Sequence, residues 1–267
     1  MQASTLPASA GWYWISQGYR LFRRQPLPLF TWMMFITMLG MLAMNLAPIG
    51  PLLAQFFVPF ITVMTLSGCR ALASGQPAHP AAWVQPLREP GVPARLLVVG
   101  GLQFGLILLA AMLAFMPFSD TLTMELERAM QEENIAPFLD AMRMPAIIFG
   151  VLYAGVSALF WFTPLLVAWH QLPVTRAIFF SLVACWRNKW AFLLYAATWG
   201  IMLYAVHFIA NMLAFAMPGL SSVVAALAMA VNLFAAAVWS CSAYVNYATV
   251  FGAASRAQAN RADGPDA

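Results

Sequence analysis

Few residues in this sequence have the types and spacing that proton transfer or polar solute binding requires. The one ionisable side chain well inside an apolar run is His207, which lies one helical turn before Asn211. A neutral histidine at such a position can bond to a neighbouring helix or shuttle protons, and the first role is the commoner. Two further amides, Asn45 and Gln103, lie in other apolar runs. These four side chains predict either helix-to-helix hydrogen bonds or a polar intramembrane cluster that lines a cavity.

Other patterns that support chemistry are missing from the sequence. Cys69, Cys185 and Cys241 are widely spaced, without a C-x-x-C pair or accompanying histidines, so neither a metal site nor a disulfide framework is indicated. The sequence has no phosphate-binding loop, no nucleophile elbow and no H-E-x-x-H pattern. We therefore predict no catalytic residue, no metal site and no cofactor, and we expect that the protein is not an enzyme.

The elements that position these side chains are predicted to be membrane-spanning helices. Of the 267 residues, 63% are hydrophobic and 8% are charged, and the mean hydropathy is +0.77. A soluble domain is about 45–50% apolar and about 25% charged, so the composition excludes a water-soluble globule. One span needs roughly 20 apolar residues. We predict an all-α integral membrane protein whose six transmembrane helices cover about 27–47, 51–69, 96–117, 146–169, 190–216 and 222–252.

Proline and glycine mark special positions inside these spans. Pro59 and Pro164 fall within predicted helices, where they predict kinks. Gly101 and Gly105 form a G-x-x-x-G pattern in the third span. Such a pattern lets two helices approach closely, so we expect helix packing there, either within one bundle or between subunits.

The basic residues indicate how the chain is oriented. If the N-terminus is cytoplasmic, six spans return the C-terminus to the cytoplasm, and 11 of the 13 Lys and Arg residues lie on that side. The exceptions, Arg128 and Arg143, share the outer loop 118–145 with six of the nine acids. This asymmetry follows the positive-inside rule and predicts a multi-pass protein of the bacterial inner membrane with both termini cytoplasmic. The basic pI near 9.2 therefore reflects topology, and we expect no nucleic-acid partner.

An amphipathic interfacial helix is predicted at 9–25, before the first span. Trp12, Ile15, Tyr19 and Phe22 recur at helical spacing and form one apolar face. Arginines gather near the end of the segment, which suits a helix that lies in the headgroup layer beside anionic lipid. A plain topological anchor is the simpler interpretation, and active lipid recognition is the alternative.

A second interfacial helix is predicted at 173–189, before the fifth span. Phe179, Leu182 and Trp186 again step by three and four residues. Each interfacial helix is followed by a two-span hairpin, so the chain has a weak, parallel internal repeat at an offset of 164 residues. The candidate contacts for anionic lipid headgroups are Arg20, Arg23, Arg24, Arg187 and Lys189.

The remaining segments are loops and a tail around one polytopic membrane domain, residues 1–255. The acidic outer loop, 118–145, has an amphipathic pattern that predicts a short helix over the mouth of the bundle. The proline-rich inner loop, 70–95, is expected to be ordered only where it packs against the interfacial helices. Residues 256–267 are expected to form a disordered cytoplasmic tail.

Three segments resemble a known family. They are 18–26 (GYRLFRRQP), 162–170 (FTPLLVAWH) and 177–181 (AIFFS) followed by 186–189 (WRNK). They are similar to an uncharacterised family of bacterial six-span transmembrane proteins (BPSS-type). More distantly, the layout resembles YciC-type proteins and the membrane domain of glycerophosphodiester phosphodiesterases. The resemblance implies a six-span inner-membrane protein and assigns it no activity. We expect no soluble catalytic domain after residue 255, so no hydrolase residues carry over.

The function that these features favour is a non-enzymatic membrane protein that contacts lipid. Such a protein would act in envelope homeostasis or as a membrane subunit, and its partners would be membrane lipids, anionic ones in particular. The first alternative is a small-solute permease with a cavity around the four polar intramembrane residues. The second is an interfacial membrane enzyme. A protein partner or a homo-oligomer is compatible with each of them.

Overall fold

The computed structural model describes residues 3–77 and 79–262, with side chains described as far as Gly252. Within that part the chain is helical between turns and contains no strand. Six of its helical stretches are long and apolar enough to cross a membrane, which confirms the predicted number of spans. They are Pro26–Asn45, Ile49–Ala73, Val92–Glu132, Ala136–His170, Lys189–Ala216 and Pro218–Gly252.

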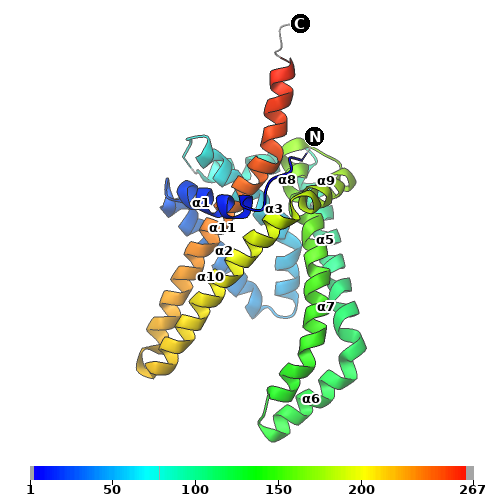
Figure 1. The fold of residues 1–267 in the computed structure, drawn as a ribbon, viewed down its shortest axis with the longest axis vertical. Coiled ribbons are helices and arrows are strands. Elements are labelled where there is room, and N and C mark those ends of the chain that lie inside the picture. Colours follow the sequence, from blue (N-terminus) through cyan, green and yellow to red (C-terminus); the bar gives the residue numbers. More distant parts are fainter. Residues whose placement is uncertain (1–2, 78, 263–267) are drawn as a thin grey trace.

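The long helices form three hairpins. They are α2 (Pro26–Asn45) with α3 (Ile49–Ala73), α5 (Val92–Phe115) with α7 (Ala136–Phe160), and α10 (Lys189–Ala216) with α11 (Ser221–Ala262). The shorter α-helices are α1 (Ala10–Phe22), α4 (Pro80–Val84), α6 (Ser119–Glu132), α8 (Thr163–His170) and α9 (Val174–Arg187). Short 3-10 helices occur at η1 (Gln85–Arg88), η2 (Met116–Phe118) and η3 (Pro218–Leu220). Figure 1 shows that the α5–α7 and α10–α11 hairpins diverge away from the end that holds α1, α8 and α9.

The packed core lies at that same end. Trp14, Phe162 and Tyr195 are fully buried there and belong to one cluster of aromatic rings from α1, the α7–α8 junction, α10 and α11. The Trp14 indole donates a hydrogen bond to Thr249 Oγ1 at 2.8 Å. Far from the core the helices are apolar and exposed, and Phe215 near the tip of α10 is 84% exposed. Such surfaces are stable in lipid, whose chains are as apolar as the side chains they meet.

Helix α1 covers the segment predicted as the first interfacial helix, and its apolar stripe is divided between the protein and the surroundings. Ile15 and Phe22 are buried, whereas Trp12 and Tyr19 are exposed. The side that packs against α10 and α11 is instead marked by Gly11 and Gly18. A Cβ on Gly11 would lie 2.4 Å from the Ala191 carbonyl oxygen, and one on Gly18 would lie 2.6 Å from Ser242 backbone atoms. The glycines decide the docking face because only they let two backbones approach so closely.

Helix α9 covers the segment predicted as the second interfacial helix and docks against the protein through the face opposite its aromatic stripe. The predicted stripe of Phe179, Leu182 and Trp186 is exposed. The buried side carries small residues, which include Ala177 and Ser181, and it packs against α7 and α8. The two helices therefore present their aromatic stripes partly or wholly to the surroundings and dock through small residues.

The fourth predicted span, 146–169, is two helices. Helix α7 ends at Phe160 and α8 begins at Thr163, so Pro164 lies in the first turn of a new helix, where its missing N–H costs no hydrogen bond. Ser181 of α9 bridges the break. Its hydroxyl accepts from the Phe162 N–H at 3.0 Å and donates to the Ala158 carbonyl at 2.9 Å. In a continuous helix the Phe162 N–H would bond to the Ala158 carbonyl. The Ser181 hydroxyl lies between these two groups and provides each of them with a hydrogen-bond partner.

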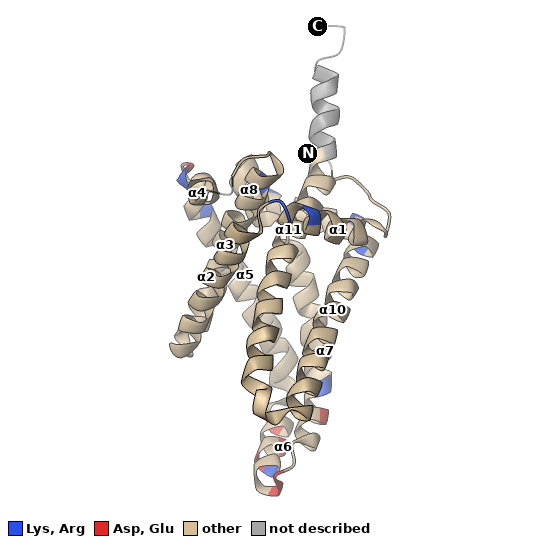
Figure 2. Cartoon of the chain, turned by 90° about the vertical axis from the view of Figure 1, so that its left-hand side faces the viewer, with Lys and Arg blue, Asp and Glu red and all other residues tan. Residues whose placement is uncertain are grey.

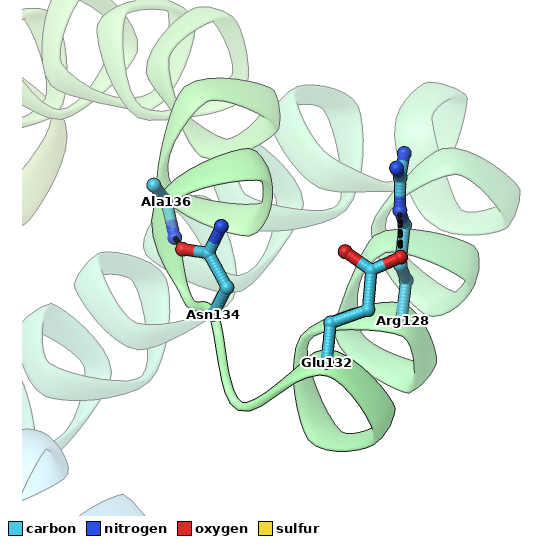
Figure 3. A network of polar contacts seen from close by, with 4 residues as sticks. All are labelled: Arg128, Glu132, Asn134 and Ala136. Atoms are coloured by element: carbon cyan, nitrogen blue, oxygen red, sulfur yellow. Dashed lines mark hydrogen bonds and ion pairs between the residues drawn. The ribbon is translucent and has the colours of Figure 1, made fainter.

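The outer and inner loops are ordered in different ways. In the outer loop the predicted short helix is α6, while the residues from Ala136 onward begin α7, whose N–H at Ala136 donates to Asn134 Oδ1 (Figure 3). In the inner loop, α4 packs against α3, where Gly68 leaves room for the Trp83 indole. The loop was expected to pack against the interfacial helices. It packs against α3 instead, because the Trp83 side chain of α4 is buried there.

The close helix packing expected at Gly101 and Gly105 occurs mainly at the neighbouring Gly100. In the G-x-x-x-G pattern, a Cβ on Gly101 would lie 3.4 Å from the Phe56 ring and one on Gly105 would meet nothing within 4 Å. The close approach is made by Gly100, whose Cβ would lie 2.2 Å from the Phe56 carbonyl oxygen of α3. Residues 256–262 of the tail that was predicted to be disordered instead continue α11, and residues 263–267 lie outside the described residues.

Candidate functional site

The two ends of the helical assembly carry opposite charge. Figure 2 shows Lys and Arg near α1, α4 and α8, and Asp and Glu near α6. We call the first the basic end and the second the acidic end. The described basic side chains of the basic end are Arg20, Arg23, Arg24, Arg70, Arg88, Arg95, Arg176, Arg187 and Lys189, and its described acid is Glu89.

The two ends also differ in how their charges are compensated. Among the described side chains, both salt bridges belong to the acidic end. Arg128 pairs with Glu132 at 2.9 Å (Figure 3), and Arg143 pairs with Asp140 at 2.8 Å. No described cation of the basic end forms an ion pair. The basic end therefore holds a cluster of cations that is open to external anions.

Lys189 lies between two exposed aromatic rings at the junction of α9 and α10. Its Nζ is 4.7 Å from the centroid of Trp186 and 5.7 Å from that of Trp190. The two rings are 69% and 65% exposed. Its neighbour Arg187 has a structural partner, because its Nε donates to Thr5 Oγ1 at 3.1 Å. Of the two candidate headgroup contacts from this segment, Lys189 is therefore the more available to an anionic headgroup.

Three arginines lie at the C-terminal end of α1 or just after it, and they have different neighbours. The Arg23 guanidinium lies 5.8 Å from the ring of Tyr19, whose other neighbour is Phe234. Arg20 and Arg24 instead line a cavity of about 490 Å³ between α1 and the last described turns of α11. Thr249 and Tyr244 contribute to its far wall. A cavity with two arginines and no Asp or Glu among its lining residues favours an anionic group such as a phosphate.

Asn188 anchors the N-terminal segment, a role that the sequence did not indicate. Its Oδ1 accepts from the Leu6 N–H at 2.8 Å, and its Nδ2 donates to the carbonyls of Ser4 and Ala184, each at 2.9 Å. The side chain is 1% exposed. The Ser4 N–H also donates to the Val250 carbonyl at 2.9 Å. The segment 4–6 is therefore tied to both α11 and the α9–α10 junction.

The basic end has a second polar cavity, which the sequence did not indicate. It measures about 490 Å³ and lies between α3, α4 with η1, and α8. Arg70 lines it, with its guanidinium 5.1 Å from the Trp169 ring, and Trp169 Nε1 donates to Ser67 Oγ at 3.2 Å. Beside it, His170 and Tyr247 share a short hydrogen bond. Glu89 is part of the same lining, so this cavity carries both charge signs.

The structure does not bring the four predicted polar intramembrane residues together. Asn45 donates to the Met41 carbonyl of its own helix at 2.9 Å, and His207 Nδ1 bonds to the Leu203 carbonyl of its own helix at 2.8 Å. Both are exposed, as is Asn211. The fourth residue, Gln103, lines a cavity between the hairpins. His207 therefore makes a contact within its helix in place of the expected bond to another one.

Two cysteines that are distant in sequence meet in the core. Cys69 Sγ and Cys241 Sγ are 3.8 Å apart, and both residues are fully buried free cysteines. Nothing in their sequence spacing of 172 residues signals this contact, which arises because α3 packs against α11.

A named bacterial protein is similar to this chain over nearly its whole length. The sequence is 35% identical over 261 residues to a protein of Burkholderia thailandensis named as a probable inner membrane protein, and the alignment covers 94% of each chain. The chain belongs to the family of that inner membrane protein. No family model and no solved structure matches the sequence. The relative and the six spans agree on a multi-pass inner membrane protein. The resemblance to YciC-type proteins and to phosphodiesterase membrane domains stays a prediction.

We expect the Cys185 thiol of α9 to react slowly with maleimide while the protein is folded. Burial raises the pKa of this thiol from 9.0 to about 12, although a hydrogen bond with Ser181 lowers it in part. Only the thiolate attacks maleimide, so at pH 8 we expect alkylation to be roughly a thousandfold slower than at an ordinary cysteine. The stabilisation from the protonated thiol is present below pH 9.0 and is lost as the pH rises toward about 12.

Mass spectrometry of alkylated peptides measures this protection. A suitable reference is a Thr175→Cys variant, which places an exposed thiol on the same helix. Alkylation of Cys185 at the rate of the reference thiol would show that α9 is not docked as described.

Proposed function

We propose that this inner membrane protein contacts anionic lipid through its basic end and that this end faces the cytoplasm. In this proposal the protein is non-enzymatic and serves envelope or lipid homeostasis, or a larger membrane assembly as a subunit. The observation that carries the proposal is the exposed aromatic stripe of α9 beside the uncompensated Lys189.

The α9 stripe has the character of a lipid-facing surface. Phe179 and Trp186 are 60% and 69% exposed, although the same helix buries alanines against the protein. Large exposed apolar patches mark interaction surfaces, and tryptophan beside a cation is typical of a membrane–water interface. Lys189 carries its charge within contact of that surface. An interfacial helix of this kind binds by apolar burial together with attraction to anionic headgroups.

Helix α1 supports the same interpretation on the other side of the molecule. Its exposed Trp12 and Tyr19 provide the apolar contact, and Arg23 lies against Tyr19. Arg20 and Arg24 line the adjoining cavity, where a phosphate group would meet two guanidinium groups. Both interfacial helices therefore combine an aromatic surface with a cation that has no carboxylate partner.

The charge distribution supports the cytoplasmic placement of the basic end. Cytoplasmic loops are enriched in Lys and Arg, and the cytoplasmic leaflet is rich in anionic lipid. The acidic end would then face the periplasm, with Arg128 and Arg143 already paired to carboxylates.

Native mass spectrometry of the protein in a mild detergent tests the lipid contact. We expect phosphatidylglycerol to be retained at a fixed stoichiometry by the unmodified protein. A double variant with Arg23→Gln and Lys189→Gln removes two cations that lack structural hydrogen bonds to other residues. Each is worth about 1 kcal/mol beside an anionic surface, so retention should fall roughly 30-fold.

A matched variant separates this effect from general loss of charge. Arg128→Gln with Arg143→Gln removes the same net charge at the acidic end, where both cations are paired, and should leave lipid retention unchanged. Equal loss in both double variants would overturn the proposal. A protein that carries no lipid at all would also contradict it and would favour the small-solute permease as the alternative.

A further inference from the structure

A cavity of about 500 Å³ lies between the hairpins, among α2, α3, α5, α7, α8 and α11. Its size is in the range of small-molecule sites. The walls are formed mainly by apolar and aromatic side chains, and Met33, Leu66 and Phe160 are examples. No Asp, Glu, Lys, Arg or His belongs to the lining. A charged ligand would find no opposite charge there, so the cavity suits an uncharged one.

Three polar side chains on one wall of the cavity lack hydrogen-bond partners among the described residues. They are Gln103 of α5 and Tyr153 and Ser157 of α7. Three hydroxyl groups in the lining, those of Thr62, Thr65 and Ser240, have protein partners. Thr62 donates to the Val58 carbonyl, and Thr65 Oγ1 accepts from Trp32 Nε1 at 2.8 Å. An unpaired polar group in an apolar medium costs free energy, so these three groups are most stable with a polar ligand atom beside them.

The broken helix forms another part of the cavity wall. Trp161 and Phe162, which separate α7 from α8, line the cavity together with Pro164. Non-helical backbone at membrane depth occurs where it is buried in protein or lines a cavity, and discontinuous helices mark substrate sites in several transporters. The fold thus keeps this break in place, through Ser181, at the wall of the same cavity.

We propose that this cavity binds an uncharged lipid, with one acyl chain along the apolar walls and an ester or hydroxyl group bonded to Gln103, Tyr153 and Ser157. Diacylglycerol has this chemistry. The medium around the spans is lipid, and the cavity is only partly enclosed by protein, so a lipid can enter it from the bilayer. This site is separate from the headgroup contacts of the basic end, and neither proposal depends on the other.

A photoactivatable diacylglycerol tests the site. The probe carries a diazirine in one acyl chain and is added at increasing mole fraction to nanodiscs that contain the full chain. Peptide mapping then compares the cavity-lining peptides of α5 and α7 with the exposed face of α10. We expect labelling of the cavity peptides to saturate and to be displaced by unlabelled diacylglycerol, while labelling of α10 rises in proportion to the probe.

Two variants and one control locate the bound lipid. Gln103→Leu removes one hydrogen bond and should raise the half-saturation concentration about fivefold. Ala243→Phe fills the cavity from α11 and should abolish the saturable labelling. Asn211→Leu makes the same kind of change as Gln103→Leu on the exposed side of α10 and should have no effect.

Several results would overturn the proposal. Labelling of the cavity peptides that never saturates would show that no site exists. Saturation that is unchanged in both the Gln103→Leu and Ala243→Phe proteins would place the site elsewhere, and melting curves of both proteins show whether each is folded. If the Ala243→Phe protein fails to fold, the half-saturation concentration of the Gln103→Leu protein alone decides whether the lipid binds in the cavity. Equal displacement by phosphatidylglycerol would overturn the assignment to an uncharged lipid.

Discussion

Replacing Gly18 by valine is expected to detach α1 and to lower the free energy of unfolding by about 3 kcal/mol or more. A Cβ at this position would lie 2.6 Å from three atoms of Ser242, two of which are backbone atoms of α11. Backbone cannot rotate away as a side chain can, so the helices must separate. Separation exposes Trp14, which is 0% exposed, and breaks its hydrogen bond with Thr249.

Two measurements report on this detachment. The melting midpoint in detergent should fall, and trypsin should cleave after Arg20, Arg23 and Arg24 at concentrations that leave the unmodified protein intact. Gly200→Val is the matched control, because Gly200 is also helical but a Cβ there meets nothing within 4 Å. A Gly18→Val protein that melts with the unmodified protein would show that α1 does not pack closely on α11.

Replacing Asn188 by alanine is expected to cost about 3 kcal/mol of stability. The change leaves the Leu6 N–H and the Ser4 carbonyl without the partner that now satisfies them, while the Ala184 carbonyl loses one bond and keeps the Asn188 backbone N–H. A buried group without a partner costs about 1–3 kcal/mol, and solvent can reach the freed N-terminal segment, which limits the total. Asn45→Ala removes an exposed asparagine and should change stability by less than about 0.5 kcal/mol.

A double-mutant cycle shows whether Asn188 acts through the N-terminal segment. Deleting residues 2–6 removes both of its partners there and should itself be destabilising. Added to that deletion, Asn188→Ala should cost much less than it does alone, since only the contact with Ala184 remains to be lost. Additive effects would mean that the asparagine stabilises the α9–α10 junction independently of the segment.

The spans and interfacial helices were predictable because the signals for them are local. A run such as 27–47 is long enough and apolar enough to cross a bilayer, whatever its neighbours are. The period of Phe179, Leu182 and Trp186 likewise depends only on helix geometry. Pro164 correctly marked a discontinuity, although the sequence does not reveal that Ser181 inserts into it and turns an expected kink into two helices.

The residues that dock the interfacial helices against the protein were not predictable from the period of the aromatic stripes. In a soluble protein an apolar stripe turns inward, whereas beside a membrane it can turn to lipid equally well. The deciding residues were Gly11 and Gly18 in α1 and Ala177 and Ser181 in α9, whose small size permits close docking. Small residues carry a weak sequence signal, which explains why the helices were found and their packing faces were not.

The candidate site was predicted only in part for a related reason. The cations at the ends of the spans are visible in the sequence, but their partners are not. The structure gives Arg187 a partner in Thr5 and leaves Lys189 between tryptophans. Gln103 lines a cavity, which is one of the two roles that the sequence left open for it, and Tyr153 and Ser157 join it from α7, the other helix of the same hairpin. How each helix is rotated about its own axis cannot be read from one sequence, so residues that assemble across helices were missed.

The close packing of α1 against α10 and α11 also constrains how the chain is made. Trp14 bonds to a residue 235 positions later, so α1 leaves the ribosome long before its binding surface exists. At about 5–20 residues per second the wait is roughly 10–50 s. During that time an amphipathic helix with exposed Trp12 and Tyr19 can rest on the membrane surface. The same aromatic stripe would thus guard the nascent protein against aggregation until the last hairpin is inserted and the N-terminal helix can close the bundle.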